Sequence, residues 1–219
     1  MTAVSIDPAL KAECPRVALG CLTASVQASA TSPALEEALR SCGQQILQLP
    51  EPRAALESSA IFATRSGYKA LGKDPARYRG SAEALIRRVI AGKGLPRINA
   101  VVDIINIVSV ESRLPIGLYD LAHVQGDITF RAGRPGETYK GIGKYDLNLE
   151  DLPLFADELG PHGSATSDSE RTMVTPETKN VLAIFVSFGG PESLERYMQR
   201  MASLLAQHAS GTNFQHSIV

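Results

Sequence analysis

The residues best suited to chemistry lie close together in a polar, serine-rich segment. Asp168 and Glu170 are carboxylates that can act as general bases. Ser169 and Thr172 offer hydroxyl groups, and Arg171 can clamp a carboxylate or a phosphate through paired hydrogen bonds. Such a set would suit hydrolysis of an ester. The alternative is a surface loop in which the Asp and Ser residues simply form a turn.

The common catalytic motifs are missing from the sequence. It holds no P-loop, no His-Glu-x-x-His and no Gly-x-Ser-x-Gly, and Gly141-Ile-Gly143 lacks the third glycine of a dinucleotide loop. The four histidines are scattered, so we expect neither a histidine triad nor a metal site. We also expect no cofactor. Cys14, Cys21 and Cys42 have no Cys-x-x-Cys spacing, which indicates reduced thiols and no disulfide framework.

Length and composition are those of an ordinary globular protein. The 219 residues are 44% hydrophobic and 21% charged, which favours one large domain. We expect that domain over residues 1–210 and a mobile tail over 211–219. The N-terminus lacks the features of a signal peptide, and no apolar run approaches the roughly 20 residues of a membrane span. These features predict a cytoplasmic protein without membrane contact, and they leave the oligomeric state open.

Positive charge is concentrated in one window. Residues 53–97 hold ten Lys or Arg against three acidic side chains, a net charge of +7, whereas the whole chain has −1. Such a window can contact RNA backbone phosphates. The alternative is a solvated helical region whose charges only maintain solubility. The candidate RNA-binding residues are Arg65, Lys69, Arg79, Arg87 and Arg88.

Apolar patterning predicts a mixture of strands and helices. We expect buried strands over 16–26 and 180–188, a hairpin over 127–140 around Gly133-Arg134-Pro135-Gly136, an edge strand or loop over 146–157, and a polar loop over 160–171. We expect helices over 32–49, from Ser81 to Gly92, over 99–112, and after Pro191. In the last of these helices the apolar stripe suits a core or a dimer contact.

The helix predicted over 99–112 is apolar except for one narrow stripe. Asn99, Asp103, Asn106, Val110 and Arg113 fall within about a quarter of its circumference. The stripe either faces water, or it lines a cleft and bonds to neighbouring backbone.

Two spaced blocks resemble the editing domain of the phenylalanyl-tRNA synthetase beta chain, the B3/B4 domain. The first block, Leu95–Asp120, has an Asn before Val-Val-Asp-Ile and then Asn106, Pro115 and Asp120 at the family's spacing. The second block, Val174-Thr175-x-x-Thr178-Lys-Asn-Val-Leu182, resembles a Val-Thr-x-x-Thr stretch that enters a buried strand. The resemblance extends from about residue 60 to 190.

A closer likeness is to free-standing proteins built from this domain alone. It is carried by Arg65-x-x-Tyr68, Gly72-x-x-Pro75, Arg79-x-Ser81-x-Glu83-Ala-Leu-x-Arg87-Arg88 and Leu114-Pro-Ile-Gly-x-x-Asp120. The resemblance implies an α+β fold of layered mixed β-strands packed with helices. It also implies a tRNA-linked protein that binds tRNA or aminoacyl-tRNA and hydrolyses mischarged aminoacyl-tRNA in trans.

Four positions depart from the synthetase pattern. Ile105 stands where the family has a Thr, Gly117 where it has a His that handles the tRNA end or water, and Ile184 where it has an acid that reads the substrate. The glycine-rich loop is replaced by residues 165–171. Hydrolysis would therefore need another constellation, such as the Asp168–Thr172 set.

Three functional hypotheses follow. The first is the tRNA-linked protein, the second a non-catalytic binding module for a small molecule or protein that has lost the editing chemistry, and the third another hydrolase using the Asp168–Thr172 loop. The pocket candidates shared by these hypotheses are Asp103, Asn106, Gly117, Asp120, Asp168, Ser169, Arg171, Thr172 and Thr175.

Overall fold

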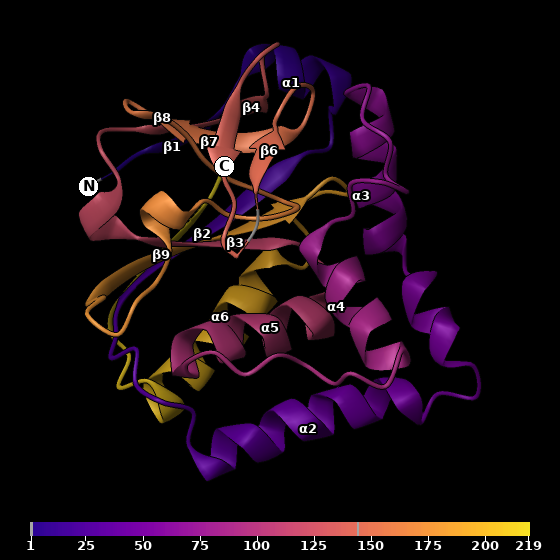
Figure 1. The fold of residues 1–219 in the computed structure, drawn as a ribbon, viewed down its shortest axis with the longest axis vertical. Coiled ribbons are helices and arrows are strands. Elements are labelled where there is room, and N and C mark those ends of the chain that lie inside the picture. Colours follow the sequence, from indigo (N-terminus) through magenta and orange to yellow (C-terminus); the bar gives the residue numbers. More distant parts are fainter. Residues whose placement is uncertain (1, 144) are drawn as a thin grey trace.

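Two long strands form the centre of the molecule. In the computed structural model, which describes residues 2–143 and 145–219, β2 (Ala18–Ser25) pairs antiparallel with β9 (Asn180–Ser187) along its whole length. β3 (Ile116–Asp120) lies beside β9, and β10 (Thr212–Ile218) lies beside β2. We call this antiparallel sheet, in the order β10-β2-β9-β3, the central sheet (Figure 1).

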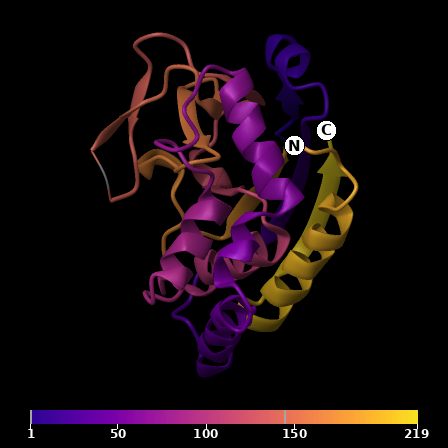
Figure 2. The same cartoon turned by 90° about the vertical axis from the view of Figure 1, so that its right-hand side faces the viewer.

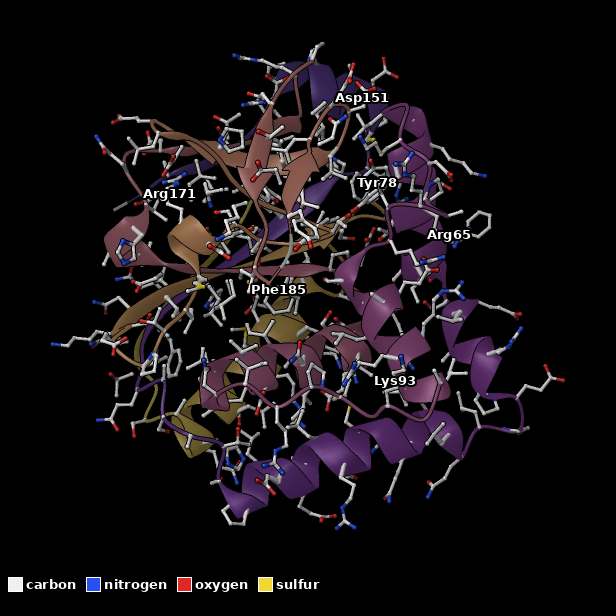
Figure 3. All side chains as sticks on the ribbon, viewed as in Figure 1. Arg65, Tyr78, Lys93, Asp151, Arg171 and Phe185 are labelled. Atoms are coloured by element: carbon white, nitrogen blue, oxygen red, sulfur yellow. The ribbon has the colours of Figure 1, made fainter. Side chains whose placement is uncertain are left out.

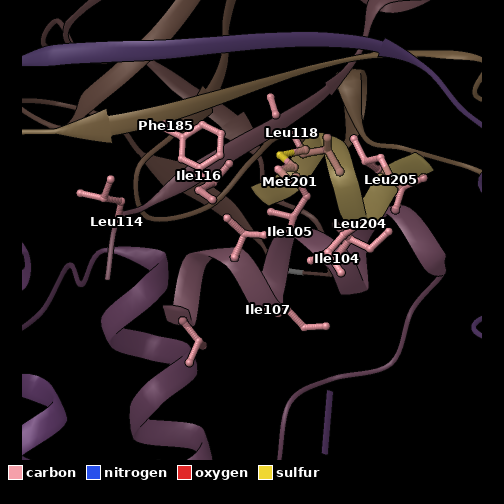
Figure 4. Close-up of a cluster of buried hydrophobic side chains, with 14 of the residues drawn as sticks. Ile104, Ile105, Ile107, Leu114, Ile116, Leu118, Phe185, Met201, Leu204 and Leu205 are labelled. Atoms are coloured by element: carbon pink, nitrogen blue, oxygen red, sulfur yellow. The ribbon is translucent and has the colours of Figure 1, made fainter. Parts of the chain in front are cut away.

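Helices cover one face of the central sheet. This layer consists of α2 (Pro33–Leu47), α4 (Ser81–Ile90), α5 (Ala100–Ser112) and α6 (Leu194–His208). α5 contacts α2, α4, α6 and β3, so its apolar side chains are enclosed on almost every side. Figure 4 shows Ile104 and Ile105 of this helix packed toward Phe185 of β9 and Met201 of α6. The enclosure explains why the α5 sequence is apolar nearly all round.

A second sheet covers the other face of the central sheet. We call it the outer sheet; in spatial order its strands are β1 (Val4–Ile6), β4 (Ile128–Ala132), β7 (Pro153–Asp157) and β8 (Gly160–Ser164). Leu19 and Ile184 of the central sheet pack in one buried cluster with Phe130 and Phe155 of the outer sheet. The central strands are thus buried on both faces, which accounts for their continuous apolar sequences.

The remaining elements border these layers. They are α1 (Pro8–Glu13), α3 (Ser59–Ala70), β5 (Thr138–Lys140), β6 (Asp146–Asn148), and the short 3-10 turns η1 (Pro52–Leu56), η2 (Leu121–His123) and η3 (Glu170–Thr172). α3 crosses one side of the molecule and contacts β9 (Figure 2). β5 and β6 form a separate two-stranded ribbon.

The main predicted elements are present. Strands β2 and β9 and helices α2, α4, α5 and α6 lie where the apolar patterns place them. Asn99 caps α5 by accepting a hydrogen bond from the Val102 N–H at 3.0 Å. The polar loop predicted over residues 160–171 contains strand β8 and the short turn η3, so it is more regular than the sequence indicated. The fold is mixed α and β, as the sequence indicated.

Two predictions are wrong. The hairpin over 127–140 does not form, since β4 pairs with β1 and β7 whereas β5 pairs with β6. Buried Phe130 decides this pairing, because it packs on Phe155 of β7 with ring centroids 4.7 Å apart. The mobile tail expected over 211–219 contains β10, an edge strand that hydrogen-bonds to β2. Its polar, exposed side chains concealed it, because an edge strand needs little apolar sequence.

Within residues 2–143 and 145–219, no helix combines the length and the apolar character that crossing a bilayer requires.

Candidate functional site

The edge of β3 that faces away from β9 is capped by the side chain of Asp168. Its carboxylate accepts a hydrogen bond from the Leu118 N–H at 3.3 Å and another from the Tyr119 hydroxyl at 3.1 Å. Because β3 is the last strand of the central sheet, the Leu118 N–H has no strand partner on that side. Asp168 as a residue is partly exposed, and both of its carboxylate oxygens accept these hydrogen bonds.

Gly117 is required by the position of Tyr119. A Cβ atom at Gly117 would lie 2.1 Å from the Tyr119 hydroxyl oxygen, and one at Gly163 would lie 2.2 Å from it. The phenol therefore fills the space that a side chain at residue 117 would need. The departure from the synthetase pattern at Gly117 thus has a packing reason in this chain.

Three tyrosine hydroxyls fix the loop that leads to Asp168. Tyr119 contacts Asp168, Tyr139 donates to the Ser167 carbonyl, and Tyr68 shares a hydrogen bond of 2.7 Å with Thr166. Burial raises the pKa of all three phenols well above the ordinary value, so none of them ionises in the physiological range. They act as neutral hydrogen-bonding groups that hold the loop in one conformation.

His162 and its neighbours form a buried polar pocket under this loop. The His162 carbonyl accepts from the Ser169 N–H at 3.0 Å and from the Thr172 hydroxyl at 3.3 Å. Thr172 and His162 are fully buried and Ser169 nearly so. Within the described residues, neither ring nitrogen of His162 nor the Ser169 hydroxyl has a hydrogen-bond partner. Burial lowers the pKa of His162 to about 4, so the ring is neutral at physiological pH.

Arg171 is fully engaged by its own fold. Its two terminal nitrogens bond to the Asp157 carboxylate, each at 2.9 Å, and they also donate to the carbonyls of His123 and Gly160. Burial is the largest single influence on Asp157 and raises its pKa, but the hydrogen bonds from Arg171 and the Gln125 N–H, together with the Arg171 charge, outweigh burial and hold the pKa of that carboxyl below its ordinary value. Arg171 therefore connects β7, β8 and η2. The sequence predicts that its guanidinium group binds a carboxylate or phosphate of a ligand, but the group binds the Asp157 carboxylate.

Other candidates are also engaged in local contacts. Asp120 accepts from the Thr178 hydroxyl at 2.6 Å, and that hydroxyl accepts from the Thr175 N–H at 2.9 Å. The Glu170 carboxylate pairs with Lys140 at 2.9 Å. The Asp120–Thr178–Thr175 bonds connect the end of β3 to the turn before β9.

Polar side chains of α5 form hydrogen bonds to neighbouring segments of the same chain. Asp103 is fully buried, and it accepts hydrogen bonds from the Thr31 hydroxyl and from the Ile98 N–H. Burial raises the pKa of Asp103, although both hydrogen bonds oppose the shift. The Asn106 side-chain nitrogen is buried without a partner among the described residues. No described contact joins Asp103 or Asn106 to the Asp168–Thr175 group.

Three arginines surround one buried glutamate between α3 and α4. The Glu83 Oε1 atom lies 3.0 Å from Arg65 Nη1, 2.8 Å from Arg87 Nε and 4.0 Å from Arg79 Nε. The Glu83 side chain is 3% exposed, whereas the arginine side chains are 35% to 46% exposed. We call Arg65, Arg79, Glu83 and Arg87 the arginine cluster. Lys69 and Arg88 are exposed nearby on the same two helices.

The predicted residues thus form separate groups. Figure 3 shows Arg65 beside α3 and Arg171 across the molecule from it. Sequence reasoning missed Glu83 as a site residue, although its spacing of four residues from Arg87 places the two side chains on one face of α4. It also missed His162, Tyr119 and Tyr139, and it used Tyr68 only as part of the resemblance carried by Arg65-x-x-Tyr68.

A groove of about 540 Å³ lies apart from all of these groups. It runs between α2 and the segment before α5, and its lining includes Leu39, Leu47, Val89, Leu95 and Arg97. None of the nine pocket candidates lines it. Across the described ranges, no group of three or more His, Cys, Asp or Glu is placed to hold a metal ion.

Comparisons with known proteins give a family match. The model described as the B3/4 domain matches residues 63–210. The chain is similar to the beta subunit of phenylalanine–tRNA ligase from Brucella abortus (strain 2308), with 38% identity over 73 residues, which are 33% of this chain and 9% of that protein. It is also similar to the same subunit from Fusobacterium nucleatum, with 32% identity over 110 residues, which are 49% of this chain and 14% of that protein.

The matched parts are thus a small fraction of those relatives, 9% to 14% of their length. Among solved structures, an N-terminal fragment of the phenylalanyl-tRNA synthetase beta subunit from Pyrococcus horikoshii is similar at a TM-score of 0.48 and 16% identity. That match covers 99% of this chain and 50% of that one.

Buried His162 predicts a specific pH dependence of stability. Its pKa of about 4 in the folded state lies below the ordinary value of 6.5. Between these values the unfolded chain binds a proton that the folded chain does not, so the free energy of unfolding falls as the pH falls. The contribution of this one group approaches about 1.4 kcal/mol per pH unit.

Urea unfolding of the wild type and of His162→Phe from pH 7.5 to 4 measures this contribution. The wild type is expected to lose stability relative to the variant below pH 6.5, and the difference to stay constant above it. His123→Gln, which changes an exposed histidine, is the matched control and should run parallel to the wild type. Parallel curves for His162→Phe as well would show that the folded state accepts the proton.

Proposed function

The chain belongs to the B3/4 domain family, and on that premise we propose that it binds tRNA or aminoacyl-tRNA through the surface of α3 and α4. The curated relatives are named as subunits of a ligase that acts on tRNA. We further propose that the protein holds this RNA without hydrolysing the aminoacyl ester. It works in the cytoplasm, where aminoacyl-tRNA is made and used, and needs neither metal nor cofactor for this role.

The arginine cluster is the observation that supports RNA binding most strongly. Three guanidinium groups converge on one carboxylate, which leaves two positive charges without an acidic partner in the cluster. Arginine side chains make paired hydrogen bonds to phosphate oxygens. Because the carboxylate lies beneath the guanidinium groups, their outer N–H groups remain accessible to a ligand.

The surrounding surface extends the positive charge. Lys69 on α3 and Arg88 on α4 are exposed, and neither has an ion pair among the described contacts. The window over 53–97 carries a net +7 in a chain of net −1. Phosphate contacts dominate the affinity of nucleic-acid binding, so a local surface of this kind can hold RNA although the whole chain is slightly acidic.

The engaged side chains argue for binding over hydrolysis. Arg171 is bonded to Asp157, and Thr172 is buried against the His162 carbonyl. The Ser169 hydroxyl is buried as well. A hydrolytic site needs a base and hydrogen-bond donors that converge on the reacting ester, and the engaged groups do not offer this arrangement.

Hydrolysis at Asp168 is the second candidate function. The residue is partly exposed, and two donors, the Leu118 N–H and the Tyr119 hydroxyl, orient its carboxylate at the edge of β3. A carboxylate in such a place can activate water if an ester binds beside it. This candidate retains the chemistry of the domain with a different acidic residue.

Positive charge on α4 should contribute to tRNA binding. Arg87→Gln combined with Arg88→Gln should weaken tRNA binding by a similar factor for every tRNA, because phosphate contacts carry no sequence information. The slope of log affinity against log salt should become shallower by about two, one for each lost contact. Fluorescence anisotropy with labelled tRNA over 50–300 mM salt measures both.

Arg134→Gln combined with Arg196→Gln is the matched control. It lowers the net charge equally, but it alters exposed arginines outside α3 and α4. Its salt slope should equal that of the wild type. If the control and the α4 variant lose affinity equally, net charge and not the α3–α4 surface determines binding.

The aminoacyl ester of a mischarged tRNA should survive incubation with the protein. Incubation of the protein with a panel of mischarged tRNAs should leave the ester half-lives unchanged, while the same samples bind the tRNAs. Release of an amino acid would contradict this. If Asp168→Asn then slowed that release by about 100-fold or more, as expected for loss of a general base, hydrolysis would belong to Asp168.

A further inference from the structure

The arginine cluster has the geometry of an anion site. Arg65 comes from α3, Arg79 from the segment before α4, and Arg87 from α4 itself. All three meet at a single oxygen atom of Glu83. The buried carboxylate orients the guanidinium groups before any ligand arrives, which lowers the entropy lost on binding.

The three arginines keep donors for a ligand. Arg65 uses Nη1 and Arg87 uses Nε to bond Glu83, at 3.0 and 2.8 Å. Arg79 is 4.0 Å from the carboxylate, too far for a hydrogen bond. Each guanidinium group has five N–H donors. Among the contacts of the described residues these arginines have no other acidic partner, so most of their donors are available.

The charge of the cluster favours one class of phosphate. Three arginines and one glutamate leave a surplus of +2. A phosphodiester within an RNA chain carries −1, whereas a terminal phosphomonoester carries about −1.5 to −2 at pH 7 and has three free oxygens. A terminal phosphate therefore matches both the charge and the number of donors better than an internal one.

An exposed aromatic ring lies one helical turn away. Phe62 on α3 is 72% exposed, and it precedes Arg65 by three residues, so the two side chains are neighbours on one helix face. A phenylalanine this exposed gains no stability from the core. An aromatic ring beside a basic site is a stacking platform for an unpaired base, worth about 1–3 kcal/mol per base in single-strand binding.

We infer that the arginine cluster and Phe62 form a site for the 5′-terminal nucleotide of an RNA. Arg65, Arg79 and Arg87 bind its 5′-monophosphate, and Phe62 stacks on its base. The inference deepens the proposed function, on which it rests for the identity of the RNA. The site itself requires only a 5′-phosphorylated end.

Paired ligands test the site directly. Short single-stranded RNAs of one sequence are prepared with a 5′-monophosphate or a 5′-hydroxyl, and a tRNA is used with its 5′-phosphate intact or removed. The 5′-phosphate should raise affinity at least about tenfold in both pairs, as expected when charge-assisted hydrogen bonds are gained. Adenosine 5′-monophosphate should compete for the site and adenosine should not.

Two variants separate the phosphate from the base. Arg79→Gln removes one cation but keeps both hydrogen bonds to Glu83, and it should reduce the advantage of the 5′-phosphate to about threefold or less. Phe62→Ala should weaken both forms of the RNA about tenfold and leave their ratio unchanged. Arg88→Gln and Tyr145→Ala are the controls, and both should preserve the ratio; Tyr145 is 94% exposed elsewhere.

The outcomes distinguish the inference from the proposed function. If tRNA binds but its 5′-phosphate makes no difference, the 5′-end site is wrong and the proposed function stands. If tRNA fails to bind while the 5′-phosphorylated oligonucleotide binds with the expected ratio, the site stands and the proposed function is wrong. Equal affinity of the two oligonucleotides overturns the inference.

Discussion

The central sheet is buried on both faces, and this constraint governs where polar chemistry can occur. β2 and β9 pack against α5 and α6 on one side and against the outer sheet on the other. A charged side chain on either strand would have to be desolvated without a partner, at a cost of several kcal/mol. Functional polar groups are therefore displaced to the edge of β3 and to α3 and α4 at its side.

Polar residues that remain inside serve the fold. Asp103 secures the chain before α2, Asp120 secures the turn before β9, and Arg171 fastens the outer sheet to η2. Removing one partner of such a buried pair is strongly destabilising, by about 3–5 kcal/mol for an ion pair. The edge of β3 and the arginine cluster combine defined geometry with polar groups that are at least partly exposed. The Tyr119 hydroxyl fills the space beside Gly117, so the first of these presents a shallow surface.

The sequence predicted most of the fold because burial leaves clear patterns. The apolar runs of β2 and β9 and the stripe of α6 follow directly from packing. The predicted pairing of β4 was wrong, because Phe130 of β4 packs on Phe155 of β7, which lies later in the chain. Strand β10 was not predicted, because its polar residues lie at an exposed edge of the sheet. The site was partly visible, since Glu83 and Arg87 share a helical spacing. Arg65 reaches Glu83 from another helix, and Asp157 pairs with Arg171 from a different strand. Sequence spacing does not reveal such contacts, because they depend on the tertiary structure.

The proposed RNA surface is formed by α3 and α4 and does not extend to the outer sheet. Photo-crosslinking of the protein to tRNA, with the linked peptides mapped by mass spectrometry, tests this claim most directly. The account predicts crosslinks in peptides from residues 59–90, with Phe62 and Tyr78 as the aromatic residues exposed or partly exposed there. Crosslinks confined to the outer sheet, α6 or β10, with none in 59–90, would contradict it.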